Sequence, residues 1–167
     1  MKIQKLTNEL EVDYDRLSEF YRSELDKLAE HYSPEELKGH KQKRTPEYFR
    51  GIIKDPAKSV DIVLSESGDL EAILEGVVHQ DGNLKIADLL WVLANNKGKG
   101  LGTQLIQHYI EEQKDKADIV ALTVSKTNTK AIRLYERLGF NYVNNLNENS
   151  LVYALPISEK GEQALKR

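Results

Sequence analysis

Three glycines alternate with two lysines at the junction between an apolar segment and an amphipathic one. The glycines are Gly98, Gly100 and Gly102, and the lysines are Lys97 and Lys99. Glycine allows a backbone to turn sharply and to approach a ligand closely. The N–H groups and the dipole of a following helix favour an anion at that point. This loop therefore predicts a cradle for a diphosphate.

Two familiar phosphate-binding loops do not fit these residues. The Walker A pattern fails because no Gly-Lys-Ser or Gly-Lys-Thr follows a four-residue gap. The dinucleotide fingerprint fails because the spacing is G-x-G-x-G and the preceding strands predict an antiparallel meander. A plain turn from strand to helix, with no ligand, remains the alternative.

Apolar periodicity predicts the elements that hold the loop. Strands are predicted at residues 1–7, 59–65, 70–79, 84–93, 119–124, 140–143 and 151–155. Helices are predicted at residues 10–32, 103–114 and 129–138, and a fourth begins at Thr45-Pro46 and ends before Pro56. The basic residues between His40 and Arg44 are predicted to lie in a loop.

Composition narrows the class of protein. The 167 residues fit a single domain, which we place at residues 1–157, with a C-terminal tail at 158–167. A net charge of −3 argues against nucleic acid as a partner. There is no apolar run long enough to span a membrane and no leader pattern, so we expect a cytoplasmic protein. Without cysteine, the chain has no disulfide, no thiolate metal site and no cysteine nucleophile.

Acidic residues are concentrated between Glu9 and Glu36. One interpretation is the solvated face of a helix. The other is a negative rim that attracts a cationic amine.

The glycine loop resembles the coenzyme A signature of the GNAT acetyltransferase superfamily. That signature reads Gln or Arg, two residues, Gly, one residue, then Gly or Ala. The segment Lys97-Gly98-Lys99-Gly100-Leu101-Gly102 follows it, with Lys97 in place of Gln or Arg. In the family, backbone N–H groups hold the pyrophosphate of coenzyme A, and the resemblance implies this role for the loop and Thr103. The lysine lacks the planar fork of arginine, but the backbone carries most of the contact.

The strand before the loop resembles the family as well. An apolar triplet, Leu90-Trp91-Val92, lies five residues ahead of the signature. The resemblance implies that its backbone pairs with the pantetheine arm and supplies an N–H to the acetyl carbonyl, as in an oxyanion hole. The Trp91 side chain is either a core aromatic or part of the channel lining.

Residues 128–140 resemble the second block of the family. This block has an asparagine at a helix start, here Asn128, a tyrosine two turns later, here Tyr135, and a Leu-Gly-Phe ending. The resemblance implies that Asn128 caps the helix and reaches the cofactor. It also implies that Tyr135 is the general acid that protonates the leaving thiolate. The alternative is a tyrosine packed on the inner face of the helix.

The base that deprotonates the amine has no match in the family pattern. Thr123 lies where the ribosomal-protein alanine acetyltransferases of the family carry a glutamate, and Ile86 lies where its histone-type members carry one. The remaining candidates are Asp88, Glu75 and His79, each with the alternative of an outward-facing polar residue. Asp88 is the preferred candidate because strand alternation puts it on the same face as Leu90 and Val92.

Taken together, the resemblance covers about residues 59–155. It implies an α/β fold of the α+β type: the GNAT fold, with a mixed, mostly antiparallel sheet of about six to seven strands flanked by about four helices. It implies an N-acetyltransferase that needs no metal. It also implies that the protein is a monomer or a homodimer. Such an enzyme moves acetyl from acetyl-CoA to a primary amine of a small molecule, a protein N-terminus or a lysine, within a ternary complex. The main alternative to an acetyltransferase is a non-catalytic acyl-CoA-binding sensor or docking module. A nucleotide hydrolase is the second alternative.

Overall fold

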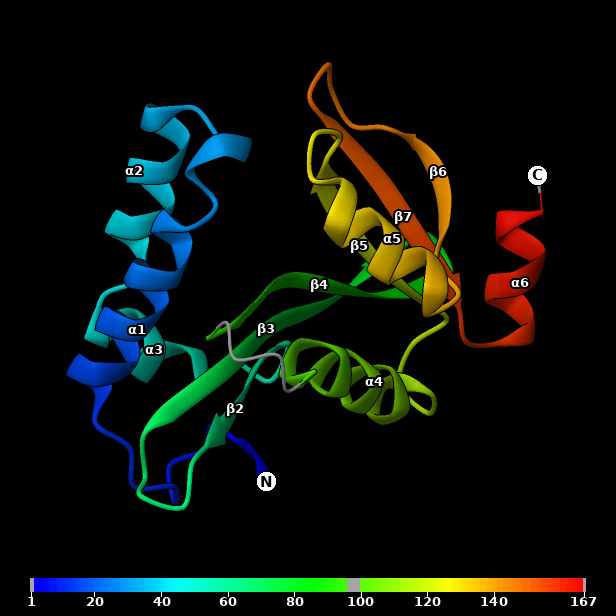
Figure 1. The fold of residues 1–167 in the computed structure, drawn as a ribbon. Helices are drawn as coiled ribbons and strands as arrows, with labels where there is room; N and C mark the ends of the chain where they lie inside the picture. The colour runs from blue at the N-terminus through cyan, green and yellow to red at the C-terminus, as the bar shows by residue number, and fades with distance from the viewer. Residues whose placement is uncertain (1, 96–99, 167) are drawn as a thin grey trace. The chain divides into compact units, whose positions relative to one another are not determined.

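The computed structural model describes residues 2–95 and 100–166. Its helices and strands, drawn in Figure 1, are β1 (Lys2–Lys5), α1 (Tyr14–Asp26), the 3₁₀ turn η1 (Ala29–His31), α2 (Pro34–Lys43), α3 (Pro46–Ile52), β2 (Lys58–Leu64), β3 (Leu70–Asp81), β4 (Leu84–Ala94), α4 (Leu101–Gln113), β5 (Ile119–Ser125), α5 (Thr129–Arg137), β6 (Asn141–Asn145), β7 (Ser150–Pro156) and α6 (Glu159–Leu165).

The strands form a mixed seven-stranded sheet in the order β1-β2-β3-β4-β5-β7-β6. β4 and β5 are parallel, with Ile86 opposite Ile119, whereas β1 with β2 and β7 with both β5 and β6 are antiparallel. This confirms the predicted mixed sheet. The described residues form six α-helices rather than about four, because two short helices at 34–43 and 159–165 were not predicted.

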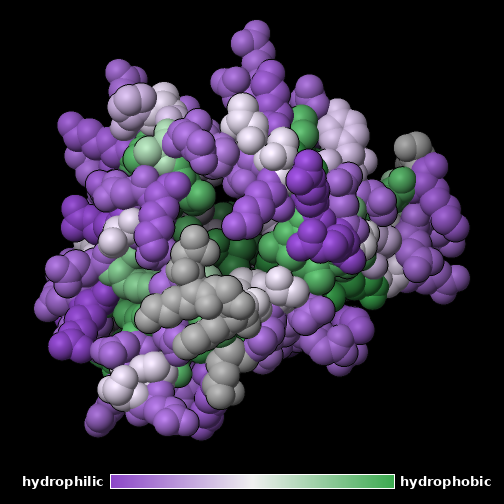
Figure 2. Space-filling model, in the orientation of Figure 1, coloured by the Kyte–Doolittle hydropathy of each residue, from purple (hydrophilic) through white to green (hydrophobic). Residues whose placement is uncertain are grey.

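The chain divides into two compact units, Met1–Glu75 with Trp91–Leu105 and Gly76–Leu90 with Ile106–Arg167. β3, β4 and α4 each contribute residues to both. Hydrophilic residues cover much of the face shown in Figure 2. No helix in the described ranges is sufficiently long and apolar to cross a bilayer.

In the first unit, α1, α2 and α3 lie together (Figure 1), and α1 contacts both of the others. Its core joins the apolar faces of α1 and α3 to the strands through Leu17, Tyr21, Leu25, Phe49, Ile52, Val60, Ile62, Ile73 and Leu93. α3 begins as predicted, because the Thr45 hydroxyl accepts the Tyr48 N–H at 3.2 Å and Pro46 follows it.

The loop predicted around His40 is wrong, because these residues belong to α2. Ser33 and Glu36 form a capping box: the Ser33 hydroxyl accepts the Glu36 N–H at 3.1 Å, and the Glu36 carboxylate accepts the Ser33 N–H at 3.2 Å. Pro34 occupies the first turn. The helix buries none of its residues, so it lacks the apolar periodicity that would have revealed it.

In the second unit, Asp118 holds the hairpin strand β4 and helix α6 to the start of β5. Its carboxylate accepts the Lys85 N–H at 2.8 Å and the Ser158 hydroxyl at 2.7 Å, and its carbonyl accepts the Ile157 N–H at 2.9 Å. These hydrogen bonds lower the pKa of the Asp118 carboxyl. A Cβ at Gly161 would come within 2.0 Å of the Asp118 carbonyl oxygen, so α6 lies against the strand at a glycine.

Gly76 on β3 makes room for the ring of Tyr109. A Cβ there would lie 2.4 Å from the Tyr109 hydroxyl oxygen and 2.6 Å from two ring carbons. We expect Gly76→Ala to lower the free energy of unfolding by about 1–3 kcal/mol, since the buried ring must move. Urea denaturation measures this loss. Gly51→Ala in α3, where a Cβ meets nothing within 4 Å, is the matched control and should stabilise by up to about 1 kcal/mol. Equal effects of the two variants would contradict the packing described.

Candidate functional site

The described end of the glycine loop has the backbone of an anion-binding turn. Gly100 has a φ of 66°, in the left-handed region that favours glycine, and α4 begins at the next residue. The Gln104 N–H bonds back to the Gly100 carbonyl at 3.1 Å. The N–H groups of Leu101, Gly102 and Thr103 therefore belong to the first turn, where an α-helix has no acceptors of its own.

This donor set fits a diphosphate. It offers consecutive backbone N–H groups at the positive end of a helix of 13 residues. A Cβ at Gly102 would meet only Val92 Cγ2, at 3.9 Å, and one at Gly100 would meet nothing within 4 Å. The remaining predicted residues of the loop, Lys97, Gly98 and Lys99, lie outside the described residues.

Of the triplet Leu90-Trp91-Val92 on β4, only the first residue is exposed to solvent. Leu90 is 42% exposed, an unusual fraction for a leucine in a sheet, while Trp91 and Val92 are half-buried. The Trp91 ring centroid lies 5.0 Å from that of His40 and 5.8 Å from that of Tyr32. Trp91 also packs against the core of the first unit, so its side chain is a partly buried aromatic that joins β4 to α2.

His40 belongs to this aromatic cluster, and its surroundings favour the neutral form of its imidazole. Burial lowers the pKa of its imidazole, and the charges of Arg44 and Lys43 lower it further, against a smaller opposite effect of Glu36. The contacts of His40 with Tyr32 and Trp91 do not follow from the loop predicted at His40 to Arg44. The Ser-Pro-Glu-Glu start of α2 is the signal that could have found them.

The two motif residues of α5 lie at its start and on its buried side. Asn128 is the N-cap, and its side-chain oxygen accepts the Ala131 N–H at 3.3 Å, which confirms the predicted capping. Its side-chain NH₂ remains available as a donor by chemistry. Tyr135 is 9% exposed, and its ring lies 5.9 Å from Phe140. Tyr135 belongs to the second unit, whereas Gly100 to Thr103 belong to the first.

Asp88 and His79 form a pair across the β3–β4 hairpin. His79 Nε2 lies 2.6 Å from Asp88 Oδ2, and the two side chains are 45% and 32% exposed. Burial raises the pKa of the Asp88 carboxyl, and the neighbouring His79 partly offsets that rise. The structure thus joins two of the three candidate bases, which the sequence analysis had considered separately.

Glu75, the third candidate, is not an outward-facing residue, because it is only 1% exposed. Its Oε1 accepts the Tyr21 hydroxyl at 2.7 Å and the Arg44 Nε–H at 3.3 Å, and its Oε2 accepts the Tyr48 hydroxyl. Burial, followed by the charge of Glu75, raises the pKa of both tyrosines, so they stay protonated donors. Both oxygens of this carboxylate are therefore already engaged inside the first unit.

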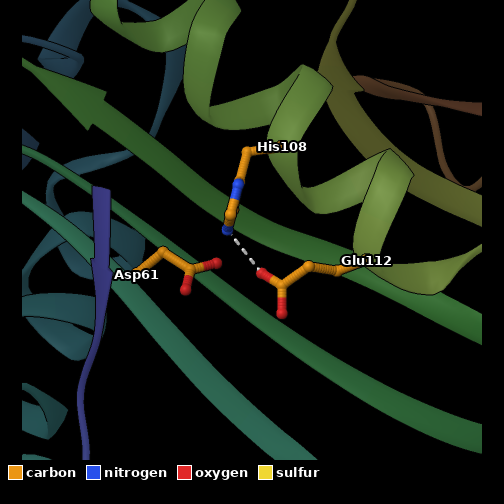
Figure 3. Close-up of side chains that lie close together, drawn as sticks. All are labelled: Asp61, His108 and Glu112. Atoms are coloured by element: carbon orange, nitrogen blue, oxygen red, sulfur yellow. Dashed lines mark ion pairs between the residues drawn. The ribbon is translucent and has the colours of Figure 1, made fainter. Parts of the chain in front are cut away.

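A second histidine–carboxylate pair lies on α4. His108 Nε2 is 2.7 Å from Glu112 Oε1, one turn further along the helix (Figure 3). Neither residue belongs to a predicted motif. In mutagenesis, this second pair serves as a control for His79 and Asp88.

A family profile and solved structures match the chain, although no curated protein does. The profile described as the acetyltransferase (GNAT) family matches residues 25–140.

The fold is similar to that of solved acetyltransferases. The PaiA N-acetyltransferase from Thermoplasma acidophilum, in complex with coenzyme A, has a TM-score of 0.75 at 20% identity, over 93% of this chain and 99% of that chain. Aminoglycoside 6'-acetyltransferase type Ii has a TM-score of 0.71 at 18% identity, over 95% and 98%. The NatC complex bound to Gag peptide and CoA has a TM-score of 0.64 at 17% identity, over 95% and 100%. At these identities the similarity shows the fold.

Proposed function

Because the chain belongs to the acetyltransferase (GNAT) family, we propose that it moves an acetyl group from acetyl-CoA to a primary amine. The observation that carries this proposal is the left-handed Gly100 immediately before α4. It supports a turn that presents first-turn N–H groups to a diphosphate, within the segment that resembles the coenzyme A signature.

The chain's own residues would hold the coenzyme as follows. Backbone N–H groups from Gly100 to Thr103 bind the diphosphate, and Lys97 and Lys99 add positive charge. The backbone of Leu90-Trp91-Val92 pairs with the pantetheine arm and donates an N–H to the acetyl carbonyl. When bound, acetyl-CoA supplies a thioester with an electrophilic carbonyl carbon and a thiol leaving group.

Tyr135 is proposed as the general acid, with Asn128 at the head of the same helix. Its phenol gives a proton to the sulfur as the bond to carbon breaks, and a thiol leaves more readily than a thiolate. Asn128 fixes the start of α5 through its cap and offers its NH₂ to the coenzyme. The acceptor nitrogen is proposed to attack the acetyl carbon directly, which needs no covalent enzyme intermediate and fits the absence of cysteine from the sequence.

An alkylammonium must lose a proton before its nitrogen can attack. This step is assigned to the pair that contains Asp88. The acceptor itself is proposed to be a small-molecule or peptide amine, in line with the aminoglycoside enzyme and the peptide-bound complex that share the fold. We further propose that residues 1–157 act as one catalytic domain, a cytoplasmic monomer or homodimer without a nucleic-acid or membrane partner.

A non-catalytic acyl-CoA-binding module is the second candidate. Thr123 and Ile86 favour it, because they occupy the positions where family members carry a glutamate base. Such a module needs the loop but neither Tyr135 nor a base. It predicts tight coenzyme binding without turnover.

A thiol-release assay with a panel of amines separates the two candidates. Acetyl-CoA is mixed with the chain and with alkylamines, aminoglycosides or peptides with free N-termini, and mass spectrometry identifies the acetylated product. We expect amine-dependent thiol release with matching product. Coenzyme binding without product from any acceptor would support the binding module, and no coenzyme binding would contradict both.

A further inference from the structure

In the His79–Asp88 pair, the carboxylate orients the imidazole ring and contacts only one of its two nitrogens. Nε2 faces the carboxylate at 2.6 Å, so in the neutral ring it is the N–H donor and Nδ1 carries the lone pair. The His79 side chain is 45% exposed, so a molecule in solution can reach the ring. An imidazole held by a carboxylate is a common general base, because the carboxylate stabilises the imidazolium that forms.

Asp88 is held rigidly enough to orient its partner. Its carbonyl accepts the Tyr109 hydroxyl at 3.1 Å, and Tyr109 is 1% exposed. Its backbone lies in register with Ala121 of the parallel neighbour β5. Burial disfavours a lone charge on the carboxyl group, so a cation on His79 compensates that cost.

We propose that His79 takes the proton from the ammonium group of the acceptor and that Asp88 is the positioning residue that holds the imidazole. This inference rests on the proposed acetyltransferase function and refines it: the base is His79, and Asp88 acts through it. It also defines the acceptor class as an alkylamine that is protonated at neutral pH, because only such an amine needs this step.

The bonds and protons balance without a further reactant. His79 Nδ1 accepts one proton from the ammonium, and the freed nitrogen forms a bond to the acetyl carbon. The carbon–sulfur bond breaks, and Tyr135 protonates the sulfur. The nitrogen loses its second proton as the amide forms, and through solvent this proton restores the Tyr135 phenol, while the His79 imidazolium releases its proton to solvent. Of the two protons lost, one ends on the coenzyme thiol and one in solvent.

Glu75 and the second histidine–carboxylate pair differ from His79 and Asp88 in their surroundings. Both oxygens of Glu75 already accept hydrogen bonds inside the first unit. His108 pairs with Glu112 within α4, where the two side chains are 38% and 21% exposed, outside any motif, and therefore serves as the matched control.

Chemical rescue tests the assignment. We expect His79→Ala to lower kcat by about 100-fold or more with little change in KM for acetyl-CoA, and added imidazole to restore part of kcat. Asp88→Asn should lower kcat by about 10-fold, the equivalent of one charge-assisted hydrogen bond, without imidazole rescue. His108→Ala should keep kcat within about twofold, because His108 lies on α4, outside both motifs and outside the β3–β4 hairpin.

The outcomes separate this inference from the function on which it rests. If the wild-type chain acetylates no amine, the proposed function fails. If it does so and His79→Ala is as active as His108→Ala, or is impaired equally with and without imidazole, the assignment of His79 is overturned while the acetyltransferase function stands.

Discussion

Replacing Tyr135 by phenylalanine is expected to lower kcat by about 100-fold or more while leaving the Kd for acetyl-CoA unchanged. The variant keeps the ring that packs against Phe140 and removes only the hydroxyl group. A positioned acid contributes about 10²–10⁴ to the rate of such a step. Steady-state kinetics with the best acceptor and calorimetric titration with acetyl-CoA measure the two quantities separately.

Tyr142→Phe is the matched control. Tyr142 is 53% exposed, and its hydroxyl donates to Asn145 at 2.6 Å on the same strand, so its loss should leave kcat within about twofold, as is typical of surface changes. If Tyr135→Phe retained full kcat, Tyr135 would be a packing residue, and the acid would have to be sought elsewhere.

Glu75→Ala is expected to lower the free energy of unfolding by about 3–5 kcal/mol. Arg44 has a side chain only 7% exposed, and Glu75 is its partner at 3.3 Å. Removing the carboxylate leaves a buried guanidinium uncompensated, and the Tyr21 and Tyr48 hydroxyls lose their acceptor. Urea denaturation monitored by circular dichroism gives the loss.

Glu47→Ala provides the comparison, because Glu47 pairs with Arg50 at 3.7 Å while 79% exposed. Exposed pairs contribute about 0–1 kcal/mol, so this control should unfold nearly as the wild type does. A loss below about 1 kcal/mol in Glu75→Ala would mean that the buried network is not what holds α1, α2 and α3 to β3.

Elements with strong apolar patterns were predictable from the sequence. β5 is apolar at almost every position, and the strands predicted at 70–79 and 84–93 are β3 and β4, which follow each other across Gly82. α2 was missed because it buries no residue, and α6 because its one buried residue is Gly161. Capping chemistry at Ser33 and Ser158 was the available signal in both cases.

The site was predictable where a motif encodes it locally. Gly100, the start of α4 and the Asn128 cap follow from short-range patterns. The pairing of His79 with Asp88 did not, because it depends on the register of the β3–β4 hairpin. The burial of Glu75 did not either, because its partners on α1, at Arg44 and on α3 lie far from it in the sequence. The roles of Tyr135 and of the loop N–H groups remain predictions.

The central claim, that N–H groups from Gly100 to Thr103 hold a diphosphate, can be tested amide by amide. Backbone amide NMR spectra are recorded with saturating acetyl-CoA and with S-acetylpantetheine, which lacks the diphosphate. We predict that acetyl-CoA shifts the amides of Gly100, Leu101, Gly102 and Thr103 strongly and that S-acetylpantetheine does not, whereas both ligands shift Leu90 to Val92. Amides from Gly100 to Thr103 that stay unmoved under saturating acetyl-CoA would contradict the account.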